Sequence, residues 1–264
     1  MPRIVSHLIL CVLAFSVHSP AQADTSSDRE EFRTAYAEYQ ALAGEGRHEE
    51  ALPAARRAYE LGAALYGSQD RNTAALALNL GKSLRHAGLQ EEAIDVLKDA
   101  LAAYEKIYGK EAMELVDPLM ELGHVMARPG QSGWQRKYYV RALRIVEDYE
   151  GADSVLYGNL NLEVGTQIMV QAQTRDCLTY LQRAYVIFST KLGSDDVRPT
   201  LAAVQLGKYY FSIHDFDEAE RFLLEALDRA EGLNESDSLT KLGVHTLLVV
   251  FYEEQGERTR ASEH

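Results

Sequence analysis

Cysteine is scarce in this sequence of 264 residues, which contains only Cys11 and Cys177. Cys11 lies in an N-terminal segment that we expect to be removed, so the remaining thiol has no partner for an internal disulfide. Side-chain packing must therefore hold the fold together. Cys177 recurs in a register of small residues described below, which favours a buried, inert thiol over a nucleophile.

Positive charge is also in short supply. There are 27 bases against 40 acids, and the formal net charge is −13. Arg3 is the only charged residue among the first 23, so their removal would leave −14. An acidic chain argues against nucleic acid as a ligand, because phosphate binding needs a basic footprint. It also argues against adsorption to anionic lipid.

Long apolar runs are missing except at the N-terminus. There Arg3 precedes a mostly apolar run over residues 4–17, and Ala21-Gln22-Ala23 has the small-x-small pattern of a cleavage site. The run is too short for a membrane span, and no stop-transfer pattern follows it. The sequence predicts a signal peptide over residues 1–23, a mature domain over 24–264 without membrane insertion, and an exported location, periplasmic or secreted. An uncleaved anchoring helix is the alternative.

Signatures of catalysis and metal binding are lacking as well. The histidines are scattered, and none lies in an H-E-x-x-H arrangement. The turn over residues 130–133 lacks the lysine and the preceding strand of a phosphate-binding loop. We therefore expect no enzyme activity, no catalytic residue, no metal and no cofactor.

What the sequence does contain is a period of 42 residues. Four registers of small residues follow this period: Gly81, Gly123, Gly165 and Gly207; Gly67, Gly109, Gly151 and Gly193; Ala58, Ala100, Ala142, Ala184 and Ala226; and Ala51, Ala93, Cys177, Ala219 and Ala261, with Gln135 as the polar member. Their agreement indicates a repeat architecture.

Each period contains two helical patterns and no strand pattern. In the clearest repeat they cover residues 73–87 and 90–108, and Gly88 and Gly109 end them. Gly81 lies inside the first pattern, where glycine costs about 1 kcal/mol relative to alanine. We expect the recurrent glycine to bring the second helix close, with the periodic alanines facing that contact.

The residues Leu80-Gly81, Ala93 and Ala100, at this spacing, resemble the tetratricopeptide repeat (TPR). The 42-residue period resembles its kinesin-light-chain-like variety, and the resemblance covers about residues 28–264. It implies an all-α, right-handed superhelical solenoid of antiparallel helix pairs, with about five full repeats and a partial sixth. It also implies a non-catalytic scaffold that binds a protein or peptide.

Several positions depart from this pattern. Tyr39 and Val249 replace the glycine of the first and sixth repeats, and the third repeat has an irregular turn over residues 128–133. The sixth repeat stops at His264, shortly after a second helix begins near Arg258. One hypothesis is that the chain is an accessory region of a larger envelope machine and is truncated here, similar to repeats ahead of TonB-type energy-transducer domains. Alternatively, this C-terminal edge self-associates.

In the resembled family, the first helix of each repeat lines a concave groove. The helix face opposite Gly81, carried through the 42-residue period, gives the candidate groove residues Leu78, Asn79, Lys82, Arg85, Met120, His124, Asn159, Leu162, Thr166, Val204, Lys208 and Phe211. Asn79 lies where related peptide-binding repeats place an asparagine that holds the ligand backbone. This stripe contains three bases but only one acid, Asp117. We therefore expect a ligand with apolar anchors and an acidic group or C-terminal carboxylate.

Overall fold

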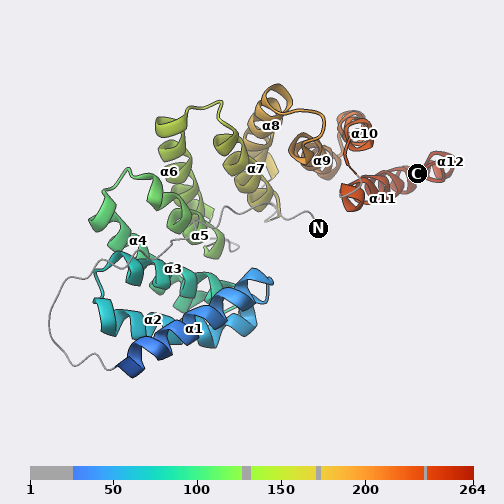
Figure 1. Ribbon diagram of the computed structural model, residues 1–264. Helices are drawn as coiled ribbons and strands as arrows, with labels where there is room; N and C mark the ends of the chain where they lie inside the picture. The colour runs from blue at the N-terminus through green and yellow to red at the C-terminus, as the bar shows by residue number, and fades with distance from the viewer. Residues whose placement is uncertain (1–25, 127–131, 171–173, 235–236) are drawn as a thin grey trace. The chain divides into compact units, whose positions relative to one another are not determined.

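The computed structural model describes residues 26–126, 132–170, 174–234 and 237–264, and all their regular structure is helical (Figure 1). The predicted signal peptide lies outside these residues. The elements are α1 (Ser26–Gly44), α2 (His48–Tyr66), α3 (Arg71–His86), α4 (Gln90–Tyr108), a 3-10 turn η1 (Met113–Leu115), α5 (Val116–Val125), α6 (Ser132–Glu150), α7 (Val155–Val170), α8 (Thr174–Lys191), α9 (Val197–Ser212), α10 (Phe216–Glu231), α11 (Ser238–Glu254) and α12 (Arg258–Ala261).

The described chain divides into two compact units, and the division falls within the sequence of α6. The N-terminal unit ends at Ile145, and the C-terminal unit runs from Val146 to His264. Odd-numbered helices are the first helices of their repeats, and even-numbered helices are the second helices. Consecutive helices pack against one another, which confirms the predicted all-α fold of helix pairs.

Side-chain caps set where the first helices begin. The Asp70 carboxylate accepts a hydrogen bond from the Asn72 backbone N–H at 2.8 Å, and Asp196 does the same for Arg198 at 2.9 Å. Ser154 lies in the same 42-residue register and accepts from Tyr157 N–H at 3.1 Å. Each cap satisfies a donor that the first helical turn leaves unpaired.

The third repeat lacks this cap, because Ala112 occupies the position. Its first helix opens with the 3-10 turn η1, and α5 is only 10 residues long. We expected the distortion of this repeat in the turn over residues 128–133, much of which lies outside the described residues. Among the described residues, the third repeat departs from the common pattern at the start of its first helix.

The recurrent glycines do bring two helices close, but the nearest partners are larger than expected. A methyl group at Gly81, Gly123, Gly165 or Gly207 would overlap Leu97, Tyr139, Leu181 or Leu223, respectively. These bulky residues form a further 42-residue register, between the two alanine registers of the second helices. The expectation that the alanines face the glycines is therefore corrected: a leucine or tyrosine side chain lies over each one.

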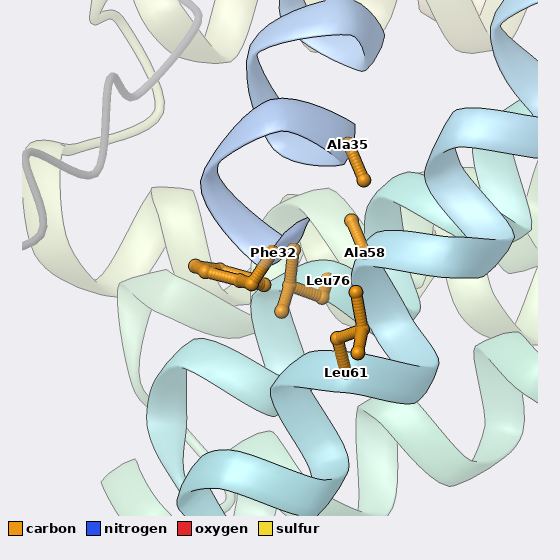
Figure 2. Packing of buried hydrophobic residues seen from close by; sticks show 5 residues of the cluster. All are labelled: Phe32, Ala35, Ala58, Leu61 and Leu76. Atoms are coloured by element: carbon orange, nitrogen blue, oxygen red, sulfur yellow. The ribbon is translucent and has the colours of Figure 1, made fainter. Parts of the chain in front are cut away.

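The first three helices share one core in the N-terminal unit. Phe32 and Ala35 of α1 meet Ala58 and Leu61 of α2 and Leu76 of α3 (Figure 2). All five are at most 8% exposed. Burial of these apolar side chains holds α1 against α2 and α3.

Candidate binding face on the first helices

The predicted groove residues fall into two sets, one in each unit. Residues 78, 79, 82, 85, 120 and 124 lie on α3 and α5, and residues 159, 162, 166, 204, 208 and 211 lie on α7 and α9. Leu78, Met120 and Val204 are only 5–7% exposed. Packing covers these three side chains, so their prediction as open ligand anchors is corrected: they belong to the core.

In the N-terminal unit, an ion pair joins the two first helices. Arg85 Nε of α3 donates to Glu121 Oε2 of α5 at 2.9 Å, and His124 Nδ1 lies 3.9 Å from the same oxygen. The side chains of Glu121 and His124 are 12% and 11% exposed, and that of Arg85 is 25% exposed. A carboxylate this buried needs such partners, because an unpaired charge is costly away from water.

Opposing effects act on the pKa of Glu121. Burial raises it, but the close approach of His124 and the nearby charges of Arg85 and Lys82 outweigh burial and lower the pKa to about 2. Glu121 is therefore ionised across the physiological range. Strongly perturbed carboxylates are more frequent at functional sites than elsewhere.

Sequence reasoning missed Glu121, although a signal for it existed. Glu121 lies 42 residues after Asn79, the position where we expected contact with a ligand backbone. Carrying that register through the repeats leads to Glu121 directly. We followed the neighbouring register instead, which leads from Lys82 to His124 and Lys208.

Two further histidines lie next to this ion pair. His48 opens α2, His86 ends α3, and their rings stack with centroids 4.2 Å apart. Arg85 Nη2 lies 3.1 Å from His86 Nε2. Burial and Arg85 lower the pKa of both imidazoles, and that of His86 falls to about 4. Both rings are therefore neutral at pH 7 and can accept as well as donate hydrogen bonds.

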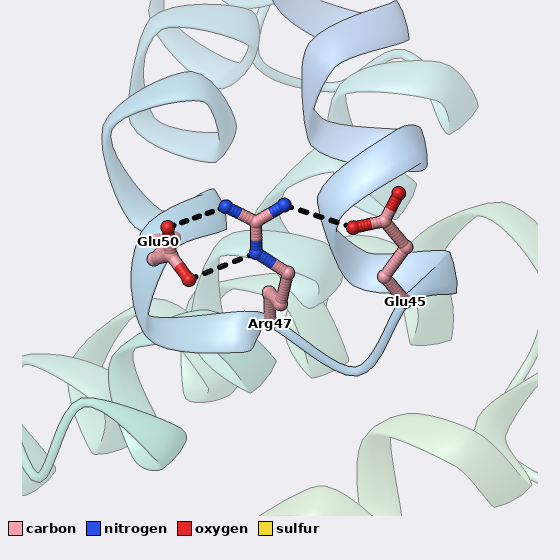
Figure 3. Close-up of polar contacts among 3 residues, drawn as sticks. All are labelled: Glu45, Arg47 and Glu50. Atoms are coloured by element: carbon pink, nitrogen blue, oxygen red, sulfur yellow. Dashed lines mark hydrogen bonds and ion pairs between the residues drawn. The ribbon is translucent and has the colours of Figure 1, made fainter.

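The turn that presents His48 is held by Arg47. Its guanidinium donates to Glu45 at 2.9 Å and to both carboxylate oxygens of Glu50, at 2.9 and 2.6 Å (Figure 3). All three side chains are about half exposed or more, so the pairs contribute little to global stability. They bridge the residues on either side of the turn and so restrict its geometry.

The predicted bases of the N-terminal unit already have carboxylate partners. Besides the Arg85–Glu121 pair, Lys82 Nζ lies 3.8 Å from Asp117 Oδ2. The stripe is therefore close to electrically balanced when the histidines are neutral. This weakens the basis for expecting an acidic group of the ligand at Lys82 and Arg85.

The C-terminal unit presents a less polar face. Leu162, Thr166 and Lys208 are partly exposed, and the Thr166 hydroxyl donates to the carbonyl of Leu162 at 2.7 Å. Phe211 packs in an aromatic cluster with Phe216 and Phe251, with ring centroids 5.7–6.1 Å from its own. Phe211 thus packs at the contact between the fifth and sixth repeats. Lys208 remains partly exposed and places a base on this face.

Acid is expected to destabilise the N-terminal unit between pH 6.5 and 4. The folded-state pKa of His86 is about 4, below the usual histidine value of 6.5, so the unfolded chain binds more protons in this interval. Stability is then full above pH 6.5 and falls as the pH falls. The charged and titratable groups that act on His86 are Arg85, His48, Glu121 and His124, and protonation adds charge beside Arg85. Below pH 4.5, protonation of Glu121 removes further stability.

Thermal unfolding at pH 7.5, 6, 5 and 4 measures this effect. His86→Gln removes the titrating ring and should flatten the loss between pH 6.5 and 4 while leaving the Glu121 step in place. An identical profile for His86→Gln and the natural chain would contradict the assignment.

The described residues offer little support for a metal site, a reactive thiol or a membrane-spanning helix. In that part of the chain, no group of three His, Cys, Asp or Glu side chains could hold a metal ion. Burial raises the pKa of Cys177 to about 11, which disfavours the reactive thiolate. Nor does any helix there have the length and apolarity needed to cross a membrane.

Comparison with family models identifies two segments of the chain. Models described as tetratricopeptide repeat match residues 40–106 and 201–239. The first segment covers the end of α1, α2, α3 and most of α4, and the second covers most of α9, all of α10 and the start of α11. No curated protein matches the chain significantly in sequence.

Solved structures share the fold at low sequence identity. Nearly identical kinesin-light-chain TPR-like repeats from Podosopora anserina align with a TM-score of 0.63 at 16% identity, over 76% of this chain and 93% of that one. BtubC (BKLC) from P. vanneervenii gives 0.63 at 17%, over 90% and 88%. Aspartyl phosphate phosphatase F from Bacillus subtilis gives 0.60 at 13%, over 90% and 71%. At these identities the likeness concerns the fold alone.

Proposed function

We propose that this chain, which is built of tetratricopeptide repeats, binds a segment of another protein on the exposed faces of its first helices, without catalysis. Repeat proteins of this kind typically mediate protein–protein interactions, using the extended surface that stacked repeats create. The observation that carries the proposal is the polar cluster of His48, Arg85, His86, Glu121 and His124.

This cluster supports binding because folding does not require it. Apolar side chains at the same places would pack without the cost of desolvating Glu121 and Arg85. Instead, one small area holds a carboxylate, a guanidinium and neutral imidazoles, which together offer both donors and acceptors. A peptide backbone needs both kinds of partner. Asn79 is half-buried on the same helix as Arg85, and its side-chain amide also offers both a donor and an acceptor.

In the C-terminal unit we propose a more apolar contact. Leu162 is partly exposed on α7, and Val250, which lies on α11 and 42 residues after Lys208, is 45% exposed. Lys208, in the register of Lys82, would receive an acidic group or C-terminal carboxylate of the ligand. The acidic part of the ligand is thereby assigned to Lys208 rather than to Lys82 and Arg85.

Peptide selection with single-residue variants tests the proposal. Peptides selected on the natural chain should bind Asn79→Ala or His86→Ala at least about fivefold more weakly, because each change removes one polar contact. Lys98→Ala on the exposed side of α4 should leave the affinity unchanged. Selected peptides that tolerate every first-helix change would refute binding at this face.

We also propose that the chain is exported after cleavage following Ala23. The support is the N-terminal sequence pattern alone. Mass spectrometry of the protein from the cell envelope should find a chain that begins at Asp24. An intact N-terminus in that fraction would instead favour an anchoring helix.

Self-association through α11 is a second candidate function. Leu239 and Leu242 are 60% and 63% exposed on α11, whereas Thr200, which lies 42 residues before Leu242, is fully buried. A second copy could cover this apolar face. Light scattering over a range of concentrations should then show dimers that Leu242→Glu abolishes; a concentration-independent monomer mass rules the candidate out.

A further inference from the structure

One side of α11 is apolar and uncovered. Leu239, Leu242 and Val250 are 60%, 63% and 45% exposed. Gly243 and Thr246 are also exposed and lie between them, at spacings of three and four residues that place all five on the same side of the helix. Among the described residues, nothing lies within 4 Å of the position that a side chain at Gly243 would take. These five residues form the α11 stripe, which is about three turns long.

The same side of the preceding first helix, α9, is covered. Thr200 and Val204, which lie 42 residues before Leu242 and Thr246, are 0% and 7% exposed, because α11 packs along α9. This is therefore the side on which one first helix receives the next. The described chain has no further first helix after α11, yet the side remains apolar. An apolar stripe on the exposed side of a helix indicates a packing partner.

We propose that a second copy of this chain covers the α11 stripe, with the two α11 helices antiparallel about a two-fold axis. This inference rests on the self-association of α11 proposed above and specifies its geometry. The stripe runs from Leu239 to Val250, so full overlap places the axis midway between Gly243 and Thr246. Leu239 of one copy then packs against Val250 of the other. Gly243 lies opposite Thr246, where small side chains let the two helices approach closely.

Charge favours antiparallel helices over parallel ones. Glu253 and Glu254 are exposed at the C-terminal end of α11, just beyond the stripe. Parallel helices would bring the four carboxylates of two copies together, and like charges repel. Antiparallel helices separate the two sets by the length of the stripe. Each set then lies near the N-terminal end of the other helix, where the helix dipole is positive.

Head-to-tail stacking of copies is less favourable. It would place the α11 stripe on α1, the first helix of the N-terminal unit. The structure describes α1 along its whole length, and none of its large apolar side chains is exposed. Its exposed positions include the carboxylates Glu30, Glu31 and Glu38, which would lose water against the leucines of α11. A second α11 offers those leucines an apolar surface instead, and a two-fold contact closes as a dimer.

Disulfide trapping on the purified full chain tests this geometry. Leu239→Cys and Val250→Cys copies, mixed in equal amounts under mild oxidation, should give a cross-linked dimer that contains one of each. Either variant alone should give at least about tenfold less cross-linked dimer, because equivalent residues lie about 16 Å apart along an antiparallel pair. Cys177 is buried and unchanged in both variants.

Light scattering at several concentrations supplies a matched pair of variants. The concentrations should span about the micromolar range, because an interface one helix wide is at the small end of specific interfaces. Leu242→Glu should weaken dimerisation by about tenfold or more, because it places a carboxylate against the stripe of the other copy. Leu224→Glu makes the same change at an exposed leucine of α10 and should alter dimerisation by less than about twofold. Circular dichroism establishes that each variant remains folded.

The contrary results overturn different statements. A monomer at every concentration overturns self-association and this geometry together, as does an equal loss in Leu242→Glu and Leu224→Glu for any role of α11. Dimers that Leu242→Glu weakens, but that cross-link as readily in Leu239→Cys alone, overturn the antiparallel geometry and leave self-association through α11 standing. Assemblies that grow beyond a dimer overturn the two-fold axis. Peptide binding to the N-terminal unit is measured separately and does not depend on these outcomes.

Discussion

Gly123→Val is expected to destabilise the N-terminal unit by about 3 kcal/mol, the upper part of the range for overpacked cores. The first atom of any side chain at this position would lie 2.5 Å from Cδ1 and 2.7 Å from Cζ of Tyr139. The tyrosine ring is rigid and fully buried, so it cannot turn away as the end of a long aliphatic side chain can. Chemical denaturation measures the change in the free energy of unfolding.

Gly243→Val is the matched control for this prediction. Gly243 also lies within a first helix, but it is exposed and has no other heavy atom close to the position of a side chain. Valine has a somewhat better helix propensity than glycine, so the control should be neutral or slightly stabilised. Adding Tyr139→Leu to Gly123→Val should recover part of the loss. Equal effects at both glycines would mean that close helix contact is not the reason for the glycine register.

Arg85→Met is expected to cost about 2–3 kcal/mol, because it leaves the Glu121 carboxylate buried with one strong partner fewer. Methionine keeps most of the aliphatic volume, so the loss reports charge pairing rather than a cavity. The pKa of Glu121 should also rise, because the charge of Arg85 helps to hold it low. Acidification below pH 4.5 should consequently destabilise the variant less than the natural chain, because the folded and unfolded pKa values of Glu121 lie closer together.

A double-mutant cycle separates this pairing from other effects. Glu121→Gln in the Arg85→Met background removes the unpaired charge and should restore more than half of the lost stability. Arg56→Met serves as the control, because its pair with Glu92 is about 40% exposed on both sides and should contribute at most about 1 kcal/mol. Strictly additive effects of the two changes at Arg85 and Glu121 would show that the two side chains do not interact.

Much of the fold could be predicted because its main determinant is a regular spacing. The pattern over residues 90–108 gave the bounds of α4 correctly, and that over 73–87 placed α3 to within two residues. Glycine and small residues at a fixed period report directly on where helices touch. The start of the third repeat could not be predicted in this way, because an absent cap at Ala112 affects only local geometry and leaves the period intact.

The candidate site was harder to predict because it depends on how neighbouring repeats are staggered. Arg85 pairs with Glu121, Arg56 with Glu92, and Glu105 with Arg141, and each pair is separated by 36 residues. These three contacts fall six residues short of the period, whereas Tyr185 and Glu225 are 40 residues apart. Adding 42 to the number of a groove residue gives the equivalent residue in the next repeat. It does not give the residue whose side chain it contacts. That offset is set by packing between repeats, so only the structure reveals it.

The contact between each glycine and its leucine or tyrosine also bears on how such a gene can change. This contact lies inside one helix pair, and Gly67 and Gly109 end their helices with nearly the same backbone geometry. Recombination that duplicates or deletes one period in frame would join compatible ends and preserve every such contact. The number of repeats can therefore evolve separately from the side chains that distinguish one repeat from another.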